Sequence, residues 1–196
     1  MSELYAAGPG FANRALLFLD TETTGVDSNA RMVEIAFQLD DFGNTIFQYN
    51  TLIKPSNFEI PWPTTQIHGV STTVAREYGQ ELVYVLYRLA KYLTYSRDVI
   101  LIAHNLDFDR RIISYDAEQI GQILSWPQTF CTMKALTQHC RLPKKTGQGY
   151  KWPSLAEAYT FLFEKPPPAG LHSARIDMLT CREIFYEGRR RGLWKL

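Results

Sequence analysis

The stretch ALLFLDTETTG, residues 15–25, decides how this chain folds. Its first five residues are all apolar, which is typical of a buried strand, and two acids, Asp20 and Glu22, follow. Side chains two residues apart on a strand share a face, so both carboxylates point to one place. Carboxylates held together repel unless a positive charge neutralises them, and a divalent cation is the usual partner. The alternative is that Asp20 ends the strand and residues 21–25 form only a turn.

A third acid follows a second apolar strand. Residues 99–103 predict this strand, and the apolar spacing within residues 108–120 predicts a helix after it. Asp109 would lie in the first turn of that helix. Asp107 competes for the same role, but an acid at a helix start commonly accepts hydrogen bonds from free backbone N–H groups, which already explains Asp107. We therefore assign the site residue to Asp109.

Two further candidates lie in LHSARID, residues 171–177. Residues 174–186 have a helical apolar side, which leaves Asp177 able to face the same cleft as the other acids. His172 precedes Asp177 by five residues, about 140° around an ideal helix. It can therefore reach the site only from a loop or from the helix entrance, a position that suits a mobile base.

These motifs, taken in order, resemble the DEDDh or DnaQ-like family of 3′-to-5′ exonucleases, which includes the proofreading subunits of bacterial replicative DNA polymerases. The matching motifs are DTETTG at residues 20–25, HNxxFD at 104–109 and HxxxxD at 172–177. The segment IHGVS, residues 67–71, also resembles the family, and the likeness covers nearly the whole chain. It implies an α/β, ribonuclease H-like fold, with a mixed central five-stranded sheet flanked by helices.

The resemblance also implies a chemistry. Two Mg²⁺ or Mn²⁺ ions would bind an oxygen-rich site suited to hard cations, formed by Asp20, Glu22, Asp109 and Asp177. His172 would take a proton from the attacking water. The expected reaction hydrolyses the last phosphodiester of single-stranded DNA or a DNA 3′ end and releases a nucleoside 5′-monophosphate. An RNA-directed exoribonuclease of the same family and a non-catalytic nucleic-acid-binding or scaffold module are the alternatives.

Five more residues are candidates for substrate binding. By resemblance, the residues after the first acids hold the terminal nucleotide: Thr23, Thr24 and Gly25. The glycine would let the backbone approach the ligand closely. Asn105 and His68 are candidate contacts to the sugar-phosphate or the base, although a turn before the next helix explains His68 equally well. We expect His104, at a strand end, only to satisfy a backbone group.

The order of the expected elements favours a mixed sheet. Three strands come first, and helices alternate with strands afterwards. The expected strands are 15–20, 31–40, 46–53, 98–103 and 128–131. The expected helices are 80–95 and 108–120, with three more after residue 131. We expect a flexible arm in residues 1–13 and a single exonuclease domain in residues 14–196.

Composition limits the class of protein. A chain of 196 residues with 45% hydrophobic residues can bury one sizeable core, and a net charge of +1 gives no sign of nucleic acid by itself. Three scattered cysteines, without a signal peptide or a long apolar run, indicate a cytoplasmic protein with no membrane partner. We expect DNA 3′ ends, favoured over RNA, as the partner, and a DNA polymerase as a possible second one. The basic and aromatic residues of loop 143–153 fit phosphate contact and a solvated surface equally well.

Overall fold

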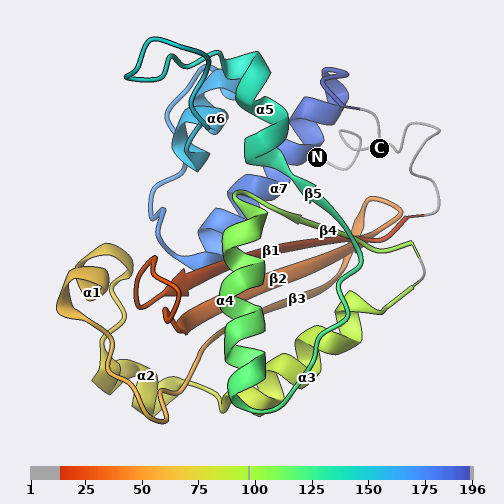
Figure 1. Cartoon of the computed structure of the whole chain (residues 1–196). Helices are drawn as coiled ribbons and strands as arrows, with labels where there is room; N and C mark the ends of the chain where they lie inside the picture. The colour runs from red at the N-terminus through yellow and green to blue at the C-terminus, as the bar shows by residue number, and fades with distance from the viewer. Residues whose placement is uncertain (1–13, 97, 195–196) are drawn as a thin grey trace.

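A mixed five-stranded sheet lies at the centre of the structure (Figure 1), a computed structural model that describes residues 14–96 and 98–194. The strand order is β3-β2-β1-β4-β5. The central strand β1 pairs antiparallel with β2 and parallel with β4, while β3 and β5 form the two edges. The strands are β1 (Leu16–Thr23), β2 (Met32–Asp41), β3 (Asn44–Leu52), β4 (Ile100–Ala103) and β5 (Gln128–Cys131). This arrangement confirms the fold expected from the sequence.

Helices cover both faces of the sheet. One face packs against α3 and α4, and the other packs against α7, whose outer side carries α5 and α6. The short helices α1 and α2 link β3 to α3. The helices are α1 (Trp62–His68), α2 (Thr72–Tyr78), α3 (Leu82–Leu93), α4 (Leu106–Gln119), α5 (Thr132–Cys140), α6 (Leu155–Phe163) and α7 (Ala174–Arg190).

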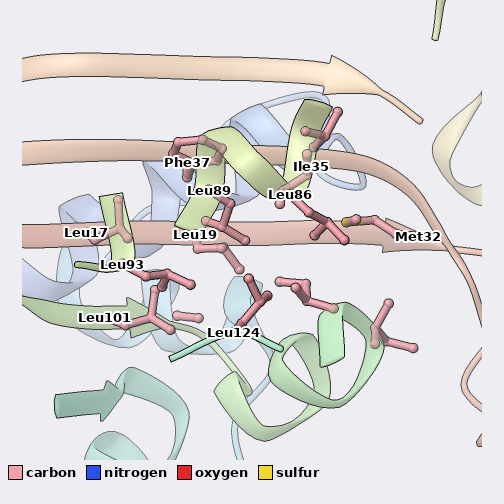
Figure 2. Packing of buried hydrophobic residues seen from close by; sticks show 14 of the residues in the cluster. Leu17, Leu19, Met32, Ile35, Phe37, Leu86, Leu89, Leu93, Leu101 and Leu124 are labelled. Atoms are coloured by element: carbon pink, nitrogen blue, oxygen red, sulfur yellow. The ribbon is translucent and has the colours of Figure 1, made fainter. Parts of the chain in front are cut away.

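The apolar run before the first acids is continuous because both faces of β1 are buried. Leu17 and Leu19 pack with α3 and α4, as Figure 2 shows beside Leu86 and Leu89. Phe18 points the other way, toward α7. The alternation continues past the apolar run, so that Asp20 and Glu22 face the α7 side while Thr21 faces α4.

Two local expectations differ from the structure. β1 extends through Thr23, because residues 21–23 continue the ladder with β2, so the alternative of a turn beginning at residue 21 is wrong. The sequence pattern also predicts no helix over residues 62–68. Helix α1 begins after Pro61, ends at Gly69 with φ 77°, and buries none of its residues, so it has no apolar stripe to reveal it.

No helix in the described part of the chain, residues 14–96 and 98–194, has the length and apolar character needed to cross a membrane.

Candidate active site

The structure brings together the four acids that the sequence singled out. β1 supplies two of them, the first turn of α4 supplies Asp109, and the first turn of α7 supplies Asp177. The charges of Asp109, Asp177 and Glu22 all act on Asp20. One oxygen each of Glu22 and Asp177 and one ring nitrogen of His172 lie within 4.8 Å of one another. Three separate segments of the chain therefore converge at the carboxyl end of β1.

Mutual repulsion and burial perturb every one of these acids. Burial, followed by the charges of its neighbours, raises the pKa of Asp20 well above its ordinary value. The same two causes raise the pKa of Glu22 to about 8. Burial raises the pKa of Asp109 to about 7 and that of Asp177 to about 6. Acids that resist ionisation in this way are stabilised as carboxylates when a cation binds among them.

Hydrogen bonds fix where Asp109 and Asp177 lie. The Asp109 carboxylate accepts bonds from the Thr21 backbone N–H at 3.1 Å and from the Thr21 hydroxyl at 2.8 Å, which ties α4 to β1. The Asp177 carboxylate accepts a bond from the backbone N–H of His172, with both oxygens at 3.3 Å. These contacts leave the other lone pairs of both carboxylates for a cation.

A fifth acid, Glu34, supports the site and was missed from the sequence. It lies directly across from Glu22 in the β1–β2 ladder and is buried. Its carboxylate accepts bonds from Asn50 Nδ2 at 2.7 Å and from the backbone N–H of Ala174 at 3.0 Å. Because Ala174 is the first residue of α7, Glu34 holds the start of the helix that carries Asp177. The signal was a lone acid inside the apolar run of β2.

His172 lies in the loop immediately before α7, as its spacing from Asp177 required. Its backbone has a φ of 72°, a left-handed conformation that is uncommon for a residue other than glycine. The side chain is exposed. Because its backbone N–H bonds to Asp177, the histidine and the acid hold fixed positions relative to each other.

A cavity of about 200 Å³ opens beside the acids, and three of the five predicted substrate residues line it. These three are Thr23, Gly25 and His68. Its apolar walls were not anticipated from the sequence; they come from Val26, Ile67 and Phe108. These wall residues come from three segments, so no single motif contains them.

His68 lies beside this cavity, and its side chain is half-buried. Its Nδ1 accepts a bond from the backbone N–H of Val70 at 3.1 Å, so the proton lies on Nε2. That Nε2 is buried and has no hydrogen-bond partner among the described residues. Burial lowers the pKa of His68, while the Thr23 backbone and the charge of Glu34 oppose that shift. His68 therefore ends α1 and holds its ring against the Thr23 side of the cavity.

The loop after β1 is held in one shape by hydrogen bonds. The Thr24 hydroxyl accepts a bond from the Arg31 backbone N–H at 2.9 Å, so Thr24 supports the loop and is not among the cavity-lining residues. Arg111 of α4 donates to the carbonyl of Asp27 at 2.6 Å and to that of Val26 at 3.1 Å. The loop therefore presents a preformed wall to the cavity.

The fold itself does not require glycine at position 25. A Cβ there would meet only Asp27 Oδ2, at 3.8 Å, which is an ordinary contact. Packing within the protein therefore does not explain the glycine at this position.

Three residues near the start of α4 do not line the cavity. Asn105 precedes the helix with a φ of 70°, its exposed side chain makes no capping bond, and it does not line the cavity. The expected capping role of Asp107 is wrong, because the helix already begins at Leu106 and Asp107 instead pairs with Lys134 at 2.5 Å. His104 satisfies the carbonyl of Pro153 at 3.0 Å, as expected.

The basic loop 143–153 is partly committed to structure. Lys151 pairs with Glu157 at 2.5 Å, and Glu157 belongs to the capping box that starts α6. Trp152 beside it is 62% exposed. The contact of this loop with nucleic acid stays a prediction for its remaining cations, Lys144 and Lys145.

Known proteins have sequences similar to this chain. DNA polymerase III PolC-type from Thermotoga maritima is 30% identical over 129 residues, which cover 65% of this chain and 9% of the polymerase. The uncharacterized exonuclease CP81 of Escherichia phage 186 is 29% identical over 150 residues, 72% of each protein. The chain thus spans less than a tenth of the polymerase it matches.

Solved structures show the same fold. Exonuclease I of E. coli in complex with a dA16 oligonucleotide matches 92% of this chain and 42% of its own chain, with a TM-score of 0.74 and 16% identity. Exonuclease I from Methylocaldum szegediense matches with a TM-score of 0.71 and 18% identity, covering 91% of this chain and 41% of its own. The RNase T family, described as exonuclease, matches residues 17–185, a range that includes all four acids and His172. The chain therefore belongs to the RNase T exonuclease family.

Proposed function

We propose that this protein is a metal-dependent 3′-to-5′ exonuclease that releases nucleoside 5′-monophosphates from single-stranded DNA or DNA 3′ ends. The observation that carries the proposal is the convergence of four acids, all with raised pKa values, beside one exposed histidine. We also propose that residues 14–196 act as one catalytic domain, since the acids come from both ends of this segment.

The residues present fit a pair of hard cations. Each acid gains its ionised form when a cation arrives, and the donors are mainly carboxylate oxygens, which suit Mg²⁺ or Mn²⁺. The proposed ligands are Asp20, Glu22, Asp109 and Asp177. Two bound ions would supply electrostatic stabilisation to the attacking and leaving oxygens of the displacement.

His172 is the proposed general base. Its ring lies beside Glu22 and Asp177, where the attacking water would also bind, and it is exposed enough to pass the proton to solvent. The bond from its backbone N–H to Asp177 keeps the imidazole close to the reacting centre. Among the described residues, His172 is the histidine grouped with Glu22 and Asp177, while His68 and His104 are held by bonds to other parts of the fold.

The cavity beside the acids is the proposed site for the terminal nucleotide. Its apolar walls suit the faces of a base, and His68 lines the same cavity. Thr23 and Gly25 line the same cavity, with Gly25 leaving room for close approach. Thr24 and Asn105 lie outside it and are proposed only as contacts for the adjoining sugar-phosphate.

DNA is the favoured substrate, and RNA is the alternative. The structure of the similar Exonuclease I holds single-stranded DNA, and discrimination against RNA depends on contacts to the 2′-hydroxyl. A DNA polymerase is a proposed partner, because the similar segment in Thermotoga maritima belongs to one. The non-catalytic alternative is disfavoured by the complete set of acids.

The test uses 5′-labelled single-stranded DNA and RNA with Mg²⁺, Mn²⁺ or EDTA. We expect a ladder of products shortened from the 3′ end, only with metal, and no cleavage of circular single-stranded DNA. Asp109→Asn should abolish the ladder. Asp107→Asn is the matched control, because Asp107 lies on the same helix turn but is exposed and paired with Lys134. Cleavage of the circle, or full activity in Asp109→Asn, would contradict the proposal.

A further inference from the structure

Helix α3 carries a stripe of aromatic and basic side chains on its outer side. The stripe consists of Tyr84, Tyr87, Arg88 and Lys91, which recur at helical spacing. Tyr84 is 68% exposed and Tyr87 is 76% exposed. Together with Tyr92, the four residues line an open cavity of about 260 Å³. The opposite side of α3 supplies leucines and a valine to the core, so packing does not explain the stripe.

The positive charge of this stripe has no acidic partner in the part of the chain that the structure describes. Residues 82–93 contain no acid, and no ion pair among the described residues involves Arg88 or Lys91. Each cation lies instead near an aromatic ring, Arg88 at 4.8 Å from the ring centre of Tyr49 and Lys91 at 5.7 Å from that of Tyr92. The stripe therefore offers charge and aromatic faces to an anionic ligand that also has flat rings.

The stripe begins at the same end of the sheet as the acids. Glu22 lies opposite Glu34, and Glu34 lies opposite Leu52 of the edge strand β3. The backbone N–H of Gln80, two residues before α3, bonds to the carbonyl of Leu52 at 2.9 Å. β3 lies two strand spacings, about 10 Å, from β1. Because Asp20 and Glu22 face α7 and α3 covers the opposite face, a strand must round the β3 edge to reach the stripe. The stripe then runs about 10 Å further along α3, from Tyr84 to Lys91.

The base of the stripe is rigid. The ring of Tyr92 stacks on Phe47 at 4.1 Å between centres, and Phe47 also packs against Phe37 at 6.0 Å. Both phenylalanines belong to the sheet, so the surface on which a ligand would lie is already ordered. Binding to an ordered surface has a smaller entropic cost than binding that must first order the protein.

We propose that this stripe binds the single-stranded nucleic acid on the 5′ side of the end that is cleaved. Tyrosine faces stack on bases and cations contact phosphates, the combination by which proteins bind single strands without sequence preference. The proposal rests on the exonuclease function proposed above. It adds that a strand leaving the active site passes the β3 edge and continues along α3.

The experiment compares short and long substrates in the full chain. KM and kcat are measured with DNA of about 3 and about 20 nucleotides, lengths below and above the size of one single-strand site. Two double variants remove the stripe, Tyr84→Ala with Tyr87→Ala and Arg88→Glu with Lys91→Glu. We expect each to raise KM for the long substrate about tenfold and to leave kcat and the short substrate unchanged.

A matched control separates this surface from net charge. Arg190→Glu with Arg191→Glu makes the same charge change at the end of α7, on the sheet face opposite α3, at cations that already pair with Glu187. We expect the control to leave the KM difference between long and short substrates intact. The proposal is overturned if the control and the stripe variants have equal effects. It is also overturned if the stripe variants leave KM for the long substrate unchanged; the stripe would then be a surface for a protein partner.

Binding to uncleaved DNA keeps this test independent of catalysis. Fluorescence anisotropy is measured in the Asp109→Asn background as a function of salt. Loss of two phosphate contacts should reduce the slope of log K against log salt by about 1.4 in Arg88→Glu with Lys91→Glu. An unchanged slope overturns the proposal. Absence of cleavage by the wild-type chain would overturn the exonuclease function instead, while the anisotropy result would still decide the stripe.

Discussion

Replacing Glu34 tests whether the acid that holds α7 is needed for catalysis. Glu34→Ala removes the acceptor for the Ala174 N–H and for Asn50 Nδ2. Two buried hydrogen bonds contribute about 2–3 kcal/mol, and relief of repulsion with Glu22 offsets part of this. We therefore expect a net destabilisation of about 1–2 kcal/mol, which lowers Tm by about 2–8 °C in a domain of this size.

The effect on turnover should be larger than the effect on stability. Ala174 lies between His172 and Asp177, so a shift of the helix start moves the base and a ligand together. A displacement of about 1 Å in a catalytic group can lower the rate about 100-fold. We expect kcat of Glu34→Ala to fall by about that factor, and saturating Mg²⁺ should not restore it.

Glu34→Gln is the informative comparison, because glutamine keeps an acceptor for the Ala174 N–H but removes the charge. It should weaken Mg²⁺ binding and regain most of its kcat at high Mg²⁺ concentration. Asn50→Ala removes only the other partner of Glu34 and serves as the control. The assay is steady-state cleavage across a Mg²⁺ titration, with Tm measured in parallel. A normal kcat in Glu34→Ala, or a kcat in Glu34→Gln that no Mg²⁺ concentration restores, would refute the positioning role.

Three other predictions concern pH, the cavity wall and a buried ion pair. The pKa values of Asp177, Asp109 and Glu22 are raised to about 6 to 8, so the metal-free protein should lose stability as pH rises from 6 to 8. Mg²⁺ should reverse this trend. A Tm in EDTA that rises from pH 6 to 8 would contradict the prediction. Arg111→Ala should remove the two hydrogen bonds that hold the loop after β1, and should raise KM about tenfold at constant kcat. Arg111→Lys should have an intermediate KM. A fall in kcat alone would argue against this role for the loop. Asp40→Ala should lower the free energy of unfolding by about 3 kcal/mol in urea titrations, because the buried carboxylate accepts a bond from Arg182 at 2.7 Å. A loss below about 1 kcal/mol would show that this ion pair contributes little to stability.

The sequence predicts the fold well because apolar runs and their spacing report burial directly. β1 and β4 are covered on both faces and read as continuous apolar runs, while α7 shows its single buried side. Helix α1 could not be predicted in this way, because it buries none of its residues and therefore has no apolar pattern; only Pro61 before it and Gly69 after it mark its limits.

The acids of the candidate site were predictable, but their supports were not. Asp20, Glu22, Asp109 and Asp177 lie in motifs short enough to be read along the chain. Glu34 acts on Ala174 across 140 residues, a contact that only strand register and helix docking create. Asp107 shows the opposite error, since a local rule for helix starts was applied where a tertiary ion pair with Lys134 decides the side chain.

α7 supplies Asp177 to the candidate site, and it is synthesised after the strands of the sheet. The five strands all precede residue 132, and the acids of β1 and α4 precede residue 110, but Asp177 and the held position of His172 depend on residues after 170. A chain emerging from the ribosome can pair its sheet before it has a working centre. At the proposed site, nuclease activity therefore requires that α7 dock after the sheet has paired.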